Sequence, residues 1–187
     1  MIKRYIANIN SFSESKLENE YNLSDEKYKH KLTIYKFDKA KRQSLSARLI
    51  LRNAISEIYG KCDYEISYTE NGKPTLPFCK FSLSHSEDFA ACVISDKDIG
   101  IDIEKVRTVK KGSNLHFLTA EEIEFLKSSK DYSASFIYLW TRKEALLKCA
   151  DISSNELSSI SVLKDNDKFI FKTENYQDYI ISLCESI

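Results

Sequence analysis

The chain has 187 residues, and its 28 Lys and Arg balance 28 Asp and Glu to a formal net charge of zero. This length suits one compact domain or two small halves that share a core. A neutral chain has no general field that attracts nucleic acid or an anionic membrane, so neither is an expected partner and any basic site must be local.

The cysteine pattern and the N-terminus indicate a cytoplasmic protein. The odd number of cysteines, their apolar surroundings and the lack of CxxC or Cys/His spacing predict reduced core thiols. Residues 1–10 contain no long apolar stretch typical of an export signal, and the apolar run 89–94 is too short to span a bilayer. The five cysteines are Cys62, Cys79, Cys92, Cys149 and Cys184.

The N-terminal part is predicted to contain a strand, a polar stretch, a helix and a turn. An apolar strand covers Ile2 to Ile9, and a charged stretch then continues to about Glu26. From Lys39 to Tyr59 apolar residues recur at the spacing of an amphipathic helix, with Gly60 as its C-cap. The Asn71-Gly72 pair and two prolines predict a turn region that follows this helix.

Three short strands follow, and the polar turns between them favour an antiparallel meander. They are expected at Lys80–Ser84, Phe89–Ser95 and Ile99–Glu104. Strand alternation puts Asp102 and Glu104 together on the face opposite the isoleucines of the third strand. The return of this strand should bring both acids to the sheet edge where the Ser84-His85-Ser86 turn lies.

The C-terminal part is predicted to contain two helices and β-hairpins. Thr119 and Glu122 have the spacing of a capping box at a helix start, a long helix follows from Ser133 to Cys149, and β-hairpins are expected from Ser158 to Cys184. The segment 168–184 repeats the plan of 80–94, which favours an α+β fold of two similar halves, 1–100 and 101–187, around a pseudo-twofold. Chance similarity between two hairpins is the alternative.

Three acids form a candidate metal site. Asp102, Glu104 and Glu144 offer only oxygen ligands, which suit a hard cation such as Mg²⁺ that also binds a substrate phosphate. The alternative for the first two acids is a salt bridge to Lys105 or Arg107. For Glu144, which borders an apolar stripe, the alternative is a surface ion pair with Lys148 at i+4.

Phosphate binding also requires cations and hydrogen-bond donors. The Ser84-His85-Ser86 turn offers hydroxyls, an imidazole and backbone N–H groups, and Lys73 precedes it. Nucleophilic catalysis by a Ser/His pair is disfavoured, because adjacent side chains point apart and no oxyanion-hole motif is visible. The basic residues between 27 and 42 form either a solvated face or a further contact to a phosphate or an acidic protein.

Four motifs occur in a characteristic order: "NGKP" at 71–74, "FSLSHS" at 81–86, "GIDIE" at 100–104 and "WTRKEALLK" at 140–148. In this order they resemble the 4′-phosphopantetheinyl transferases of the longer, surfactin-synthetase-type class. The resemblance implies an α+β fold of two similar halves. It also implies transfer of the phosphopantetheine arm from coenzyme A to a serine of an apo-carrier protein, an acyl or peptidyl carrier domain, with release of adenosine 3′,5′-bisphosphate.

The resemblance assigns roles residue by residue. Asp102, Glu104 and Glu144 would bind Mg²⁺ or Mn²⁺, Glu144 would also be the base for the incoming serine, and Lys148 would contact the phosphates. Glu122 matches a family acid near the metal site, besides its capping-box interpretation. The residues that match coenzyme-binding positions are Lys31, Ser44, Lys73, Pro74, Ser84 and His85, the last near the 3′-phosphate.

Two other functions remain open from the residues. The acids alone would permit another Mg²⁺-dependent phosphoryl-transfer enzyme, although the Ser-His and Lys-Pro elements argue against it. A non-catalytic module that binds coenzyme A or a carrier protein is the other alternative. The chain is short for the long class but has the motifs of both halves, so a monomer is expected.

Overall fold

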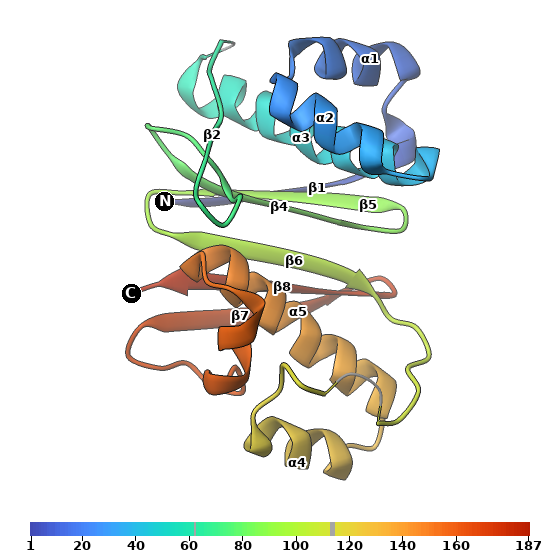
Figure 1. Cartoon of the computed structure of the whole chain (residues 1–187), viewed down its shortest axis with the longest axis vertical. Helices are drawn as coiled ribbons and strands as arrows, with labels where there is room; N and C mark the ends of the chain where they lie inside the picture. The colour runs from blue at the N-terminus through green and yellow to red at the C-terminus, as the bar shows by residue number, and fades with distance from the viewer. Residues whose placement is uncertain (62, 113–114) are drawn as a thin grey trace.

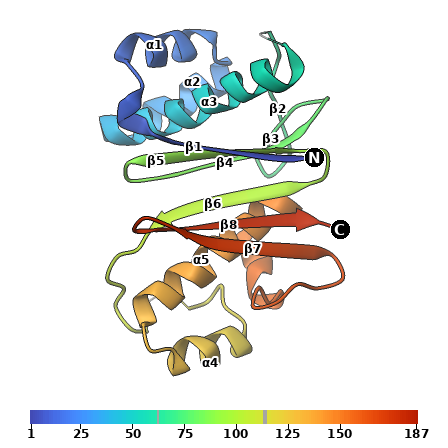
Figure 2. The ribbon, with the colours of Figure 1, turned by 180° about the vertical axis from the view of Figure 1, so that it is seen from behind.

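A computed structural model describes residues 1–61, 63–112 and 115–187. Two three-stranded antiparallel sheets stack on each other between two layers of helices, as Figures 1 and 2 show. The first sheet has the strand order β1-β5-β4 and the second has the order β6-β8-β7. The fold class is therefore mixed α+β, as predicted.

The elements of the first half cover residues 2 to 95. The sheet strands are β1 (Ile2–Asn8), β4 (Lys80–Ser86) and β5 (Phe89–Ser95), and β2 (Ser67–Tyr68) pairs with β3 (Pro74–Thr75). The helices are a 3₁₀ turn (Ile9–Ser11), α1 (Glu14–Leu23), α2 (Glu26–Ile34) and α3 (Asp38–Tyr59). Helix α3 ends at Gly60, whose φ of 63° is left-handed, so the predicted C-cap is confirmed.

The second half follows with residues 99 to 186. It contains the strands β6 (Ile99–Lys105), β7 (Phe169–Tyr176) and β8 (Tyr179–Ser186). Its helices are α4 (Ala120–Ser128), α5 (Tyr132–Ala150) and a 3₁₀ helix, η2 (Ser154–Ser159). The predicted long helix is confirmed to within one residue at each end.

The core has three parts that correspond to the layers. One cluster packs α3 against the first sheet, a second packs α4 and α5 against the second sheet, and a third fills the space between the sheets. The third cluster includes Val93 of β5 and Ile101, Ile103 and Ile181 of the second sheet. The isoleucines of β6 thus occupy one buried face, as the alternation predicted, and the acids lie on the other.

The predicted three-stranded meander is wrong. Strands β4 and β5 form the expected hairpin, but β6 pairs with β8, and the other neighbour of β5 is β1. The short turn at 96–98 carries the chain from one sheet to the other instead of closing a hairpin. Strand β5 is buried along its whole length, and a buried strand satisfies its apolar pattern by stacking against a second sheet as well as by pairing within one.

Two other predictions need correction. The predicted polar stretch that ends at about Glu26 contains the helix α1, capped by Ser13, and the basic stretch after it begins with α2, capped by Asp25. Each of these helices buries only two residues, so its apolar periodicity is weak. In the tail, one hairpin begins at Phe169, and η2 and a loop occupy the start of the predicted hairpin region.

Glu122 has a structural role in the second half. The capping box with Thr119 is confirmed, and the Glu122 carboxylate also pairs with Lys143 at 2.8 Å, with both side chains fully buried. Lys143 Nζ donates further to the carbonyls of Leu157 at 2.7 Å and Ile160 at 2.6 Å. The backbone N–H of Val162 donates to the other carboxylate oxygen at 2.7 Å. This satisfied network joins α4, α5 and η2, and burial lowers the pKa of Lys143 against the opposing effect of Glu122.

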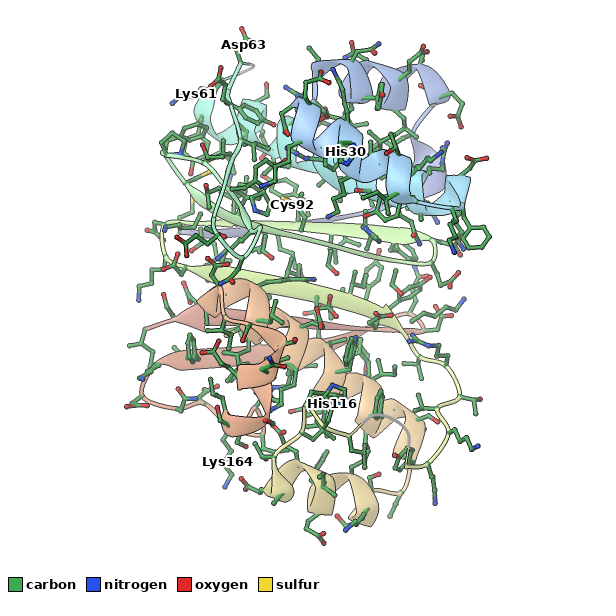
Figure 3. All side chains as sticks on the ribbon, in the orientation of Figure 1. His30, Lys61, Asp63, Cys92, His116 and Lys164 are labelled. Atoms are coloured by element: carbon green, nitrogen blue, oxygen red, sulfur yellow. The ribbon has the colours of Figure 1, made fainter. Side chains whose placement is uncertain are left out.

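Four cysteines, Cys79, Cys92, Cys149 and Cys184, are buried thiols without a disulfide, which agrees with the prediction of core thiols, and Cys62 lies outside the described residues. Figure 3 shows Cys92 between the first helix layer and the sheets. In the described residues no helix combines the length and apolarity that a membrane crossing requires.

Candidate functional site

A cavity of about 670 Å³ lies where α2, α3, β4 and the β2–β3 turn meet β6 and α5. Ser44, Ala47 and Arg48 of α3 form part of its wall. Of the three histidines only His85 lines it; His30 lies on α2 and His116 near α5 (Figure 3). Eight predicted site residues line this cavity: Lys31, Ser44, Lys73, Pro74, Ser84, His85, Asp102 and Lys148.

The two acids of β6 meet the serines of β4, as predicted. Ser84 Oγ donates to Asp102 Oδ1 at 2.7 Å, and Ser86 Oγ donates to Glu104 Oε2 at 2.8 Å. The meeting does not depend on a meander, because β4 lies alongside β6 across the junction between the sheets. The proximity of these acids to the serines was therefore predicted correctly, although the strand topology was not.

Lys148 contacts Asp102 and not Glu144. Lys148 Nζ donates to Asp102 Oδ1 at 2.7 Å and to the Ile101 carbonyl at 3.1 Å, and the Asp102 side chain is only 6% exposed. The alternative that Lys148 forms a surface ion pair with Glu144 is therefore wrong. A lysine and a buried carboxylate instead meet at the cavity wall.

The salt-bridge alternative holds for Glu104 only. Arg107 Nη1 lies 3.2 Å from Glu104 Oε2, whereas Lys105 pairs with Asp178 at 3.1 Å. Neither Glu104 nor Glu144 lines the cavity itself. Glu144 nevertheless lies within electrostatic reach of the other two acids: burial raises its pKa, the charges of Asp102 and Glu104 add to this effect, and Lys148 opposes it.

The donor set at Asp102 fits a hard cation. Asp102 Oδ2 is buried and has no hydrogen-bond partner among the described residues. A buried carboxylate oxygen without a partner is costly, and a divalent cation with its waters would compensate it. Among residues 1–61, 63–112 and 115–187, no three Asp, Glu, His or Cys side chains lie close enough together to hold a metal ion in the conformation described.

Cationic groups surround the opposite part of the same wall. Burial, together with the charges of Lys148 and Lys31, lowers the pKa of His85 to about 4. Lys73 Nζ donates to the Cys149 carbonyl at 3.2 Å, and the Asn71 side chain donates to the Asp151 carbonyl at 2.5 Å. The β2–β3 turn is thus fastened to the end of α5, and the cations converge on a space suited to an anion.

The low pKa of the half-buried His85 predicts a pH-dependent loss of stability. Its folded pKa lies below the unfolded value of 6.5, so the unfolded chain binds the proton first, and the contribution present above pH 6.5 is lost as the pH falls toward 4. Between pH 7.5 and pH 5 this amounts to about 2 kcal/mol. Urea unfolding of the wild type and His85→Gln at both pH values measures it. The variant should lose less stability than the wild type, and equal losses would contradict the assignment.

Sequence reasoning missed one wall of the cavity. Arg48 Nη2 donates to Tyr68 Oη at 2.8 Å and lies 3.0 Å from Asp25 Oδ2, and its guanidinium stacks 4.1 Å from the Tyr28 ring centroid. Tyr28 Oη is in turn hydrogen-bonded to Ser44 Oγ at 2.8 Å. The available signal was Arg48 itself, a charged residue within the apolar stripe of α3.

Residues 98–185 match the model of the 4′-phosphopantetheinyl transferase superfamily. The match covers β6, α4, α5 and the second sheet, which contribute Asp102, Glu104, Glu144 and Lys148. The resemblance indicated by the four motifs is therefore confirmed.

Individual relatives extend the similarity into the first half. The chain is 34% identical to the 4′-phosphopantetheinyl transferase psf-1 of Bacillus pumilus over 114 residues. This aligned region covers 57% of this chain and 49% of that protein. It is 28% identical over 161 residues to the 4′-phosphopantetheinyl transferase gsp of Aneurinibacillus migulanus, an alignment that covers 76% of this chain and 68% of that protein. It is 32% identical over 133 residues to the 4′-phosphopantetheinyl transferase Sfp of Bacillus subtilis, with 67% of this chain and 59% of that protein covered. The chain thus spans between 49% and 68% of the length of these relatives.

Proposed function

We propose that this protein transfers the 4′-phosphopantetheine arm of coenzyme A to a serine of an apo-carrier protein and releases adenosine 3′,5′-bisphosphate. The observation that carries the proposal is the buried carboxylate of Asp102, which meets Lys148 and Ser84 at the wall of a cavity lined by further cations. Its second oxygen has no hydrogen-bond partner among residues 1–61, 63–112 and 115–187. The matched relatives are named 4′-phosphopantetheinyl transferases.

Asp102, Glu104 and Glu144 would hold Mg²⁺, or Mn²⁺ in its place. When bound, the cation would neutralise charge on the pyrophosphate of coenzyme A. Lys148 would bind the same phosphates, for which its contact with Asp102 already orients it. Lys31, Ser44, Lys73, Pro74, Ser84 and His85 would bind the rest of coenzyme A, with His85 near the 3′-phosphate.

Glu144 is the proposed base. The carrier serine loses its proton to this carboxylate while its oxygen forms the new bond to phosphorus, and the bond from phosphorus to adenosine bisphosphate breaks. Burial raises the pKa of Glu144, which brings a carboxylate nearer to the range in which a general base is effective. Positioning and charge neutralisation supply most of the catalysis in such transfers.

The two halves, 1–100 and 101–187, are proposed to be related by a pseudo-twofold. Each has the order strand, helix, hairpin, and in each the last strand lies at the centre of its sheet. Both hairpins turn with a positive φ at the first turn residue, Glu87 and Gln177. In each half, the residue that follows the first strand donates its backbone N–H to the hairpin turn. Ile9 N donates to the Asp88 carbonyl at 2.9 Å, and Val106 N donates to the Asp178 carbonyl at 2.8 Å. A cytoplasmic monomer is part of the proposal.

Intact-mass analysis with coenzyme A, Mg²⁺ and a panel of apo-carrier proteins tests the proposal. One carrier should gain the mass of a single phosphopantetheine arm, and EDTA should prevent the gain. Coenzyme A binding without transfer to any carrier would instead indicate a binding module. Cleavage of coenzyme A without a modified carrier would indicate another phosphoryl-transfer reaction.

A further inference from the structure

Alternate serines of β4 connect the two sheets. Strand β6 is an edge strand of its sheet, and its backbone N–H groups at Ile101, Ile103 and Lys105 donate to serine hydroxyls of β4. The distances to the Oγ atoms of Ser82, Ser84 and Ser86 are 3.1, 3.3 and 3.2 Å, respectively. Each hydroxyl oxygen accepts a bond that a neighbouring strand would otherwise accept, and its own proton remains available to another acceptor.

Two of these three hydroxyls donate a hydrogen bond to an acid of the candidate metal site. Ser84 donates to Asp102 and Ser86 donates to Glu104. Ser82 accepts from the N–H of Ile101, and the preceding residue, Gly100, has no side chain to accept a bond. The three serines therefore make the same contact between strands, but only Ser84 and Ser86 orient a carboxylate. Ser84 also lines the cavity, whereas Ser86 does not.

Glu104 is held by two donors of different character. Ser86 Oγ at 2.8 Å and Arg107 Nη1 at 3.2 Å both contact Oε2. The Arg107 side chain is 60% exposed, whereas Ser86 is buried and anchored by the N–H of Lys105. Without the serine, the exposed arginine would be the donor that remains to this oxygen in the described part of the chain, and it would draw Glu104 toward solvent.

We propose that Ser86 is a positioning residue that orients Glu104 toward a divalent cation and thereby sets the affinity of the site for that cation. The inference rests on the proposed function, in which Glu104 is a ligand. It assigns to Ser86 a contribution to cation binding and none to the binding of coenzyme A in the absence of a cation.

The experiment measures Mn²⁺ binding to the full chain by electron paramagnetic resonance, without coenzyme A or carrier protein. Ser86→Ala should weaken Mn²⁺ binding by ~10-fold or more, the usual effect of removing a partner that orients a metal ligand. Ser82→Ala removes the same contact between strands and should change the affinity by less than ~2-fold. Ser86→Thr, which keeps the hydroxyl, should bind Mn²⁺ like the wild type.

Three results separate the possible failures. Equal Mn²⁺ affinities for Ser86→Ala and Ser82→Ala overturn the positioning role, provided that Glu104→Gln binds more weakly than the wild type. If Glu104→Gln also binds like the wild type, the metal assignment in the proposed function is wrong. Should Ser86→Ala not fold, Ser86→Cys has a similar size and a weaker donor, and wild-type affinity in that variant overturns the role as well.

Discussion

Replacement of Asp102 by Asn is expected to lower kcat by ~10³-fold or more, because loss of the charge that holds a catalytic cation costs several kcal/mol of transition-state stabilisation. The Asp102 side chain is 6% exposed, against 22% for Glu104. It meets Ser84 and Lys148 through one oxygen, and its other oxygen has no hydrogen-bond partner in the described part of the chain. Asn has the same shape, so the contact with Ser84 can persist while the charge is lost.

The fold of Asp102→Asn should survive. The substitution leaves Lys148 without its carboxylate but relieves a buried oxygen that has no partner among the described residues. Intact-mass assays of kcat and KM, together with melting temperatures, check this prediction. Asp178→Asn is the matched control, because Asp178 is an exposed acid that pairs with Lys105. Lys105 lies on β6, the strand that also carries Asp102. Wild-type turnover of Asp102→Asn would refute the metal assignment.

Replacement of Gly100 by Ala is expected to lower the free energy of unfolding by ~3 kcal/mol or more and to impair catalysis. A Cβ at this position would lie 1.9 Å from the Ala145 carbonyl oxygen and 2.7 Å from Cys149 N. Both atoms belong to the backbone of α5, so no side chain can rotate away and the helix itself must shift. Overpacking of a core usually costs ~1–3 kcal/mol, and backbone clashes lie at the upper end or beyond.

The catalytic effect follows from the position of Gly100. Residues 100, 102 and 104 share one face of β6, and α5 packs on this strand and carries Glu144 and Lys148. A shift of α5 therefore separates the acids and the lysine that the proposed mechanism needs together. This explains physically why the "GIDIE" motif begins with glycine.

Thermal unfolding and kcat measurements of Gly100→Ala test this account. For a chain of this size, 3 kcal/mol corresponds to a decrease in melting temperature of roughly 6–12 °C. Gly60→Ala serves as the control, since this residue has a φ of 63° and open space around the added Cβ. It should cost only ~1 kcal/mol and leave kcat unchanged. Wild-type stability of Gly100→Ala would show that α5 does not approach β6 so closely.

The sequence by itself determined the features that depend on neighbouring residues. The apolar spacing in α3 and α5, the C-cap at Gly60 and the capping box of Thr119 and Glu122 all act within one or two helical turns, so a local pattern is sufficient to predict them. The four motifs likewise contain most of the candidate site residues. Six of these residues line one cavity: Lys73, Pro74, Ser84, His85, Asp102 and Lys148.

Only the tertiary structure decided which distant residues meet. A strand pattern shows that β5 and β6 are buried but does not choose between pairing in one sheet and stacking in two. The charge pattern of α5 suggested that Lys148 pairs with Glu144, yet Asp102 lies closer once β6 packs on the helix. Lys143 likewise pairs with Glu122 because α4 packs against α5. Local spacing constrains a side chain to a face, and the partner on that face is set by the packing of the whole chain.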